Sequence, residues 1–175
     1  MDPLHQYVLS FCFFSQPKSF YDSVGDEHVK VFNHQEINSY LNLTDTFHFN
    51  RGEPNFFSQH GPASFAFWAH SFYLNKEEAD LLNSDVEGLL EILFEQLEDY
   101  LIVNNITKEK ITSLKTLYDC RCEVLFSTLR QPGIQTETFT LRQGPLRVLT
   151  EFGIDFHYWP LVENQIGQLK EFASA

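Results

Sequence analysis

The chain has little cysteine and no long apolar run. Its 175 residues include three cysteines, an odd number and a poor basis for a disulfide framework. The apolar run at residues 7–14 has about the length of a strand and falls far short of the roughly 20 residues that span a bilayer. The N-terminus also lacks the basic region of a secretory leader. These absences predict a cytoplasmic protein that does not insert into a membrane.

Positive charge is also scarce. Twelve Lys and Arg stand against 24 Asp and Glu, which gives a formal net charge of −12. A protein must bring cations to a polyanion, so this balance argues against direct binding of nucleic acid and of anionic membrane surfaces. The charge is unevenly spread, because residues 76–100 hold nine acidic residues and one lysine and so carry a net charge of −8.

No motif of a known catalytic or metal site is present. Asp155 and His157 share one face of an expected strand, but no nucleophile turn of the Gly-x-Ser-x-Gly type accompanies them. His48, His60 and His70 are 12 and 10 residues apart, which matches no familiar ligand spacing. We therefore expect no metal and no cofactor, and the residues favour a non-enzymatic protein.

Apolar and aromatic residues are abundant. Hydrophobic residues make up 43% of the chain and aromatic residues 15%, with 18 Phe. This composition supports a large aromatic-rich core in a chain of ordinary single-domain length. We predict one α+β domain over residues 1–175, with a mixed or antiparallel sheet and helices packed on one of its faces.

Several segments of the sequence show the patterns of β-strands. Residues 7–14 (YVLSFCFF) are apolar throughout, which predicts a central strand buried on both faces. Cys120 and Cys122 share a strand face with Val124 and predict buried structural cysteines. Pro132-Gly133 suits a type II turn and predicts a hairpin between residues 120–129 and 135–142. Further strands are expected at residues 46–49, 63–74 and 154–159.

The expected helices show apolar residues at three- and four-residue spacing. Residues 86–101 form such a stripe, and Ser84 and Glu87 match a capping box at its start. Asn75 suits the cap of a turn before it. Further helices are expected at residues 36–41, 108–118, from Pro145 to Gly153, and at 162–172.

The acidic helix is the most informative feature of the sequence. Four glutamates at spacings of 4, 4 and 3 lie opposite the apolar stripe, and two aspartates extend the strip. Like charges four residues apart repel by a few tenths of a kcal/mol, and no base between residues 77 and 99 offsets that repulsion. The strip is either a surface that is solvated or paired with bases of residues 108–147, or a surface that binds a partner. Its residues are Asp80, Glu87, Glu91, Glu95, Glu98 and Asp99.

The leading hypothesis is a non-enzymatic acidic protein that binds a basic protein partner. An inhibitor or immunity protein that blocks a nuclease toxin, or another effector that binds nucleic acid, is the class that this pattern suggests. The oligomeric state is left open.

The alternative is a small-molecule or cofactor-binding α+β protein, an enzyme included, with an aromatic-lined pocket. Its expected residues are Arg51, Phe56, Phe57, His60, His70 and His157.

Overall fold

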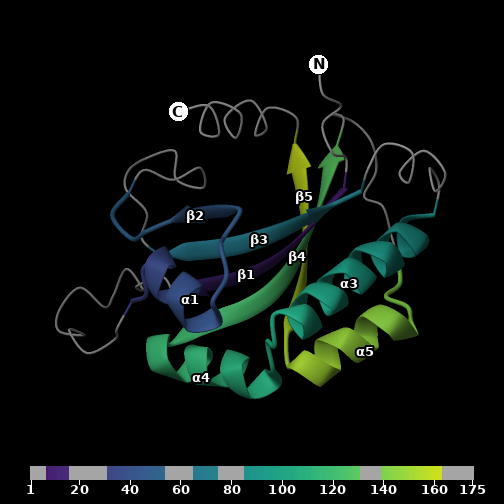
Figure 1. Ribbon diagram of the computed structural model, residues 1–175. Coiled ribbons are helices and arrows are strands. Elements are labelled where there is room, and N and C mark those ends of the chain that lie inside the picture. The colour runs from purple at the N-terminus through teal and green to yellow at the C-terminus, as the bar shows by residue number, and fades with distance from the viewer. Residues whose placement is uncertain (1–6, 16–30, 54–64, 75–84, 131–138, 163–175) are drawn as a thin grey trace.

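The computed structural model describes residues 7–15, 31–53, 65–74, 85–130 and 139–162. Its strands and helices follow one another along the chain and are labelled in Figure 1. In chain order they are β1 (Tyr7–Ser15), α1 (His34–Leu41), β2 (Phe47–Phe49), β3 (Phe67–Tyr73), α3 (Val86–Val103), α4 (Lys108–Tyr118), β4 (Cys120–Arg130), α5 (Gln143–Phe152) and β5 (Asp155–Val162).

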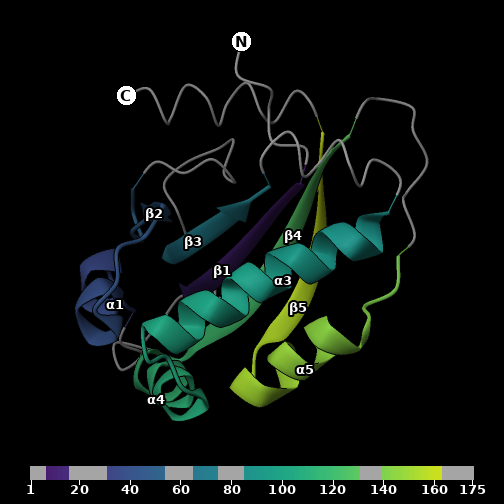
Figure 2. The same ribbon diagram turned by 45° about the vertical axis from the view of Figure 1, so that its right-hand side comes forward.

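The five described strands form one mixed sheet in the order β2-β3-β1-β4-β5. β1 is its central strand and runs antiparallel to both neighbours, while β4 and β5 are parallel. The four described helices lie on one face of this sheet (Figure 2). The predicted α+β fold, with helices covering one face, is therefore confirmed.

The alternation of side chains along β1 explains why this strand is apolar throughout. Leu9, Phe11 and Phe13 point to the helices and are fully buried in the main core, together with Trp68 of β3. Cys12, between them in sequence, is equally buried but belongs to a second apolar cluster on the other face of the sheet. Both faces of the central strand thus carry apolar side chains, as the run at residues 7–14 predicted.

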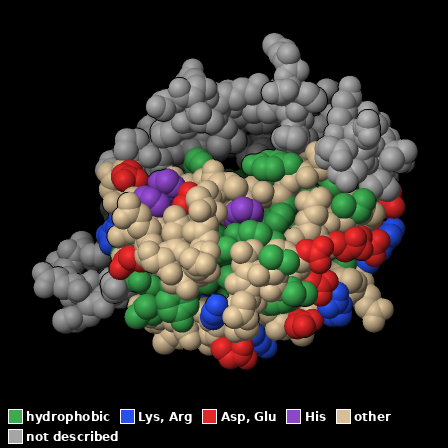
Figure 3. Space-filling view, viewed as in Figure 1, with side chains coloured by type: hydrophobic (Ala, Val, Ile, Leu, Met, Phe, Trp, Pro, Cys, Tyr) green, Lys and Arg blue, Asp and Glu red, His purple; other side chains and the backbone are tan. Residues whose placement is uncertain are grey.

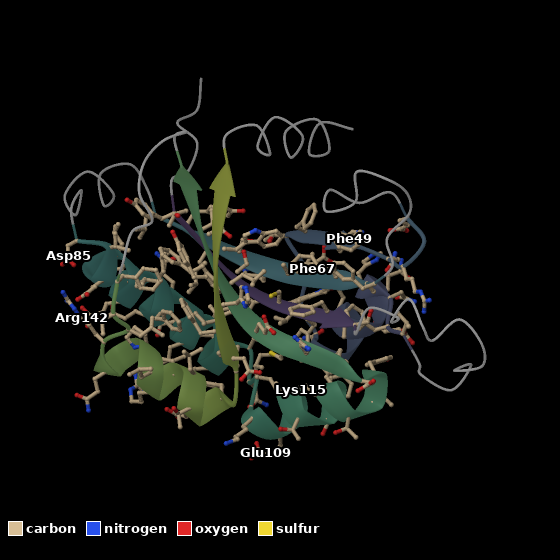
Figure 4. The ribbon with its side chains drawn as sticks, turned by 180° about the vertical axis from the view of Figure 1, so that it is seen from behind. Phe49, Phe67, Asp85, Glu109, Lys115 and Arg142 are labelled. Carbon is tan, nitrogen blue, oxygen red and sulfur yellow. The ribbon has the colours of Figure 1, made fainter. Side chains whose placement is uncertain are left out.

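The second cluster is built largely from aromatic rings of β2 and β3. Phe49 and Phe67 stack with ring centroids 5.4 Å apart, and Figure 4 shows both rings from behind the sheet. Leu125 of β4 and Ala69 complete its buried members. Aromatic residues are therefore packed in two apolar layers, one between the sheet and the helices and one on the opposite face of the sheet.

The predicted hairpin after β4 is wrong for the residues that the structure describes. The two neighbours of β4 are β1 and β5, and residues 139–142 form no strand. Instead the chain continues through α5 and returns as β5, and a crossover of this kind is what places two consecutive strands in parallel. Pro132-Gly133 and the rest of residues 131–138 lie outside the described part.

Most of the expected helices are present, with small shifts at their ends. α4 has the predicted bounds, and α1 and α5 each begin two residues before the predicted start. The predicted capping box, with Ser84 as the N-cap, is wrong. The N-cap of α3 is Asp85, whose carboxylate accepts a hydrogen bond from Gly88 N at 2.9 Å. Val162, the expected start of the last helix, is instead the last residue of β5. The rest of that helix, residues 163–172, and the turn at Asn75 lie outside the described residues.

Gly153 ends α5 in a left-handed conformation, with φ of 66°. Gly144, in the first turn of the same helix, has open space where a Cβ would be. We expect Gly153→Ala to lower the free energy of unfolding by about 1 kcal/mol, and Gly144→Ala to raise it by up to about 1 kcal/mol. Urea unfolding of both variants checks the pair, and a change of the same sign in both would contradict this account of the helix end.

Candidate functional site: the acidic face of α3 and α5

α3 separates its apolar and acidic residues onto different sides. Its apolar side is buried against the sheet, with Leu93 and Leu97 inaccessible to solvent. The glutamates predicted as a strip lie on the side away from this core, where α5 runs beside α3 (Figure 2). The α3–α5 face is defined here as Asp85, Glu87, Glu91, Glu95, Glu98 and Asp99 of the α3 region with Arg142, Arg147 and Glu151 of the α5 region.

Arg142 gathers three carboxylates at the start of α3. Its guanidinium lies 3.3 Å from Asp85, 3.2 Å from Glu87 and 2.8 Å from Glu91. Glu87 also accepts a hydrogen bond from the backbone N–H of Thr140 at 3.1 Å. The chain just before α5 is thus fastened to the first two turns of α3 by charge-assisted hydrogen bonds.

Arg147 makes a second pairing near the other end of α3. Two of its nitrogens reach the two oxygens of Glu98, each at 2.6 Å, and one also lies 3.2 Å from Glu151. This is a bidentate pair, the geometry in which arginine binds a carboxylate most specifically. The hydrogen bonds from Arg147 lower the pKa of Glu98 below its usual value.

The predicted strip therefore splits into paired and unpaired carboxylates. Glu87, Glu91 and Glu98 pair with arginines that lie more than 40 residues further along the chain. This agrees with the interpretation in which bases of residues 108–147 pair with the strip. Glu95 and Asp99 are exposed and form no ion pair with any residue that the structure describes. Asp80 lies outside the described residues.

Negative charge remains in excess on the α3–α5 face. Seven carboxylates share two guanidinium groups there, which leaves a surplus of five negative charges. Figure 3 shows acidic side chains in a row with basic ones beside it, over the helices at the right-hand side of the molecule. The internal ion pairs relieve the like-charge repulsion along α3 without making the face neutral.

A second polar cluster, not foreseen from the sequence, joins α1 to the strand β2. The rings of His34 and His48 stack with centroids 3.5 Å apart and planes within 13°. His48 Nδ1 lies 2.6 Å from Asp45, and His34 Nδ1 lies 3.1 Å from the side-chain nitrogen of Asn50. Asn50 in turn bonds Glu53. Single histidines 14 residues apart give no sequence signal of this contact.

The carboxylate of Asp45 is oriented by a chain of hydrogen bonds that starts in the core. Trp68 Nε1 donates to the side-chain oxygen of Asn38 at 2.6 Å, and the amide nitrogen of Asn38 donates to Asp45 at 2.8 Å. Burial alone would raise the pKa of Asp45, but the hydrogen bonds from His48 and Asn38 outweigh it and lower that pKa. Asp45 is thus a fixed anion that holds Nδ1 of His48.

The structure does not bring together the described residues of the alternative pocket. His70 points to the helices, where its ring stacks on Tyr100 at 4.2 Å and its Nδ1 lies 3.2 Å from the carbonyl oxygen of Thr44. His157 of β5 is exposed, on the same side as Trp159 of the second apolar cluster and therefore on the opposite face of the sheet. Arg51 is exposed in the turn after β2. Phe56, Phe57 and His60 lie outside the described residues.

No group of three or more His, Cys, Asp and Glu side chains among the described residues is placed to hold a metal ion. Of the three histidines considered for such a site, His48 and His70 each have the separate partners given above. Parallel rings like those of His34 and His48 also do not suit a shared metal, because a metal binds an imidazole nitrogen in the plane of its ring.

All three cysteines are free thiols in the interior. Cys120 and Cys122 lie in the main core and Cys12 in the second cluster, so the prediction of buried cysteines on one strand face is confirmed for the first two. Burial raises the pKa of Cys120 to about 12, and it raises the pKa of Cys12 and Cys122 as well. Such thiols are poor nucleophiles at neutral pH.

Comparisons of the whole chain give no relative from which a role could be taken. No family model matches the sequence, and neither a curated protein nor a solved structure matches it. Among the described residues, no helix is long and apolar enough to cross a membrane. A function must therefore be argued from the chain's own surfaces.

Proposed function

We propose that the protein is a non-enzymatic acidic binding protein whose α3–α5 face docks onto a basic surface of another protein. The observation that carries this proposal is the surplus of five negative charges on that face, after its two arginines are counted. An acidic surface steers a basic partner toward itself and disfavours partners of the same sign.

The internal ion pairs support a docking role in a second way. Arg142 and Arg147 hold Glu91 and Glu98 in defined positions before any partner arrives, so less side-chain entropy is lost on binding. Glu95 lies between these two glutamates along α3, and Asp99 lies one turn beyond it. Because they have no cation of their own among the described residues, Glu95 and Asp99 are the side chains that we expect a partner's Lys or Arg to contact.

A basic surface that normally binds nucleic acid is the proposed type of partner. Carboxylates spaced along a helix can occupy positions that phosphates would take, which makes an inhibitor or immunity protein against a nuclease the specific form of the proposal. The charge of the chain as a whole, −12, is of the sign that such a partner attracts.

The test is a charge reversal at the two unpaired positions. The double variant Glu95→Lys, Asp99→Lys should weaken binding of a basic protein captured from the host by at least about tenfold, through lost attraction and new repulsion. Affinity is measured by titration with the purified captured protein at about 0.1 M and about 0.5 M salt, since exposed charge pairs weaken as the Debye length shrinks. Inhibition of the nuclease activity of that protein, where it has one, tests the specific form.

The matched control reverses two exposed acids outside this face. Glu109→Lys with Asp155→Lys changes the net charge by the same amount, on α4 and at the start of β5. Binding should fall much less in this control, and the melting temperature of the test variant should be unchanged or raised because like-charge repulsion is removed. Equal loss of affinity in both variants would reduce the effect to net charge, and no loss in either would reject the α3–α5 face as the docking surface.

A further inference from the structure

Three polar residues are buried among those that the structure describes, and one of them is a glutamate. Ser15 accepts a hydrogen bond from the backbone N–H of Ala66 at 2.9 Å. The hydroxyl groups of Thr128 and Tyr158 are also hydrogen-bonded, 2.9 Å apart. Glu123 of β4 is 8% exposed, yet its carboxylate accepts no hydrogen bond from any described residue. Buried polar groups in proteins are rarely left without a hydrogen-bond partner, because that costs free energy.

The groups nearest to Glu123 do not supply this partner. Cys12, opposite Glu123 on β1, donates its thiol hydrogen to the backbone oxygen of Glu123 and not to the carboxylate. The guanidinium of Arg121 lies 3.9 Å from the carboxylate, which is beyond hydrogen-bond distance, and the Arg121 side chain is more than half exposed. In the α3–α5 face, by contrast, Arg147 approaches the carboxylate of Glu98 to 2.6 Å.

A second carboxylate lies beside Glu123. The parallel pairing of β4 and β5 sets Glu123 opposite Asp155, and neighbouring strands are about 4.8 Å apart. By the alternation of each strand, both side chains share the face of Leu125 and Trp159, which carries no described helix and is seen in Figure 4. Asp155 is exposed and forms no ion pair with any residue that the structure describes. Since like charges at such neighbouring positions repel, the two carboxylates would be stabilised by a cation between them.

We propose that Glu123 and Asp155 form a binding site for a small organic cation that carries N–H donors, an ammonium or a guanidinium group. The hydrogens of this group fill the acceptor positions that Glu123 leaves open, and its charge offsets the repulsion between the two carboxylates. Asp155 provides the accessible contact, and Glu123 provides the buried one.

An organic cation suits this pair better than a metal ion. Metal ions held by protein side chains usually take three or more of them, and no such group of His, Cys, Asp and Glu exists among the described residues. The other titratable side chains on this part of the face, Arg121 and His157, are both exposed. Neither fills the acceptor positions of the Glu123 carboxylate.

Titration with methylguanidinium chloride tests the site. The ligand salt replaces sodium chloride at constant ionic strength, while NMR follows the backbone amides and the carboxyl carbons of Glu123 and Asp155. We expect shifts that saturate, with a Kd of about 1–50 mM, the range of a weak and very small ligand. Tetramethylammonium has the same charge but no N–H donor, so it should give no saturating shift.

Two variants assign the saturating shifts to the buried carboxylate. Glu123→Gln keeps the shape of the side chain but removes its charge, so the Kd should rise at least about tenfold. The melting temperature of this variant should be unchanged or raised, because a buried charge without a close partner is removed. Glu109→Gln removes an exposed acid of α4 and should change the Kd less than about twofold. Saturation by tetramethylammonium, or an unchanged Kd in Glu123→Gln, would overturn the proposal.

A third measurement separates a small cation from a basic side chain of a protein partner. The α3–α5 face lies on the helix side of the sheet and Glu123 on the other, so Glu123→Gln should bind the captured basic protein as tightly as the unmodified chain does. A loss of about tenfold in that affinity, without saturable binding of methylguanidinium, would assign the cation to the partner protein and overturn the small-ligand site. Failure of the α3–α5 face to bind any protein leaves the methylguanidinium result as it stands.

Discussion

Replacing Trp68 with alanine is expected to lower the free energy of unfolding by about 3–5 kcal/mol, the range typical of a large aromatic ring removed from a core. Trp68 is fully buried on β3, and its indole meets Phe11 and Phe13 of the central strand edge to face, with centroids 6.0 and 5.8 Å apart. The cavity would open at the contact between β1, β3 and α1, where the structure has little freedom to collapse. Urea unfolding measures the loss.

A milder change at the same residue tests its polar contact. Trp68→Phe keeps most of the apolar ring but removes the Nε1–H that donates to Asn38, at a cost of about 1–3 kcal/mol. Leu117→Ala, at a position about half exposed on α4, serves as the control and should change stability by less than about 1 kcal/mol. A loss from Leu117→Ala as large as that from Trp68→Ala would contradict the location of the core.

The parts of the fold that could be predicted from the sequence are those whose signal is local. The run YVLSFCFF is buried on both sides because it forms the middle strand, and the apolar spacing of residues 108–118 gave the bounds of α4. The partner of β4 could not be predicted in this way. A Pro-Gly turn favours a hairpin locally, but the parallel pairing of β4 with β5 depends on where α5 packs, which is a property of the assembled core.

The candidate site shows the same division. The spacing of the glutamates placed them on one side of α3, but Arg142 and Arg147 reach them from about 50 residues further along the chain. Pairing with bases of residues 108–147 was one of the expected alternatives, but the charge count could not decide between them, because the pairing depends on where α5 packs. The stacked histidines were missed for a related reason, since the contact depends on how α1 is placed beside β2.

The buried thiols lead to the prediction of a steep loss of stability in alkali. Cys12, Cys120 and Cys122 have raised pKa values in the folded protein, about 12 for Cys120, whereas an unfolded chain ionises its thiols near their ordinary pKa of 9.0. Above about pH 9 the unfolded state therefore binds fewer protons than the folded state. The free energy of unfolding should be flat below that pH and then fall, by up to about 1.4 kcal/mol per pH unit for each thiol.

The number of thiols that contribute can be tested by removing one. In Cys122→Ala, urea unfolding between about pH 8 and pH 11 should give a slope smaller by about a third, because one of three linked protons is lost. Tyr100, whose pKa burial raises to about 12, acts in the same direction but only above about pH 10, so the comparison is cleanest between pH 9 and 10. An unchanged slope there would mean that Cys122 ionises equally in both states, which contradicts its fully buried position on β4 in the main core. A reduced slope would also predict that thiol reagents reach Cys122 only through unfolding, since its thiolate is then absent from the native protein.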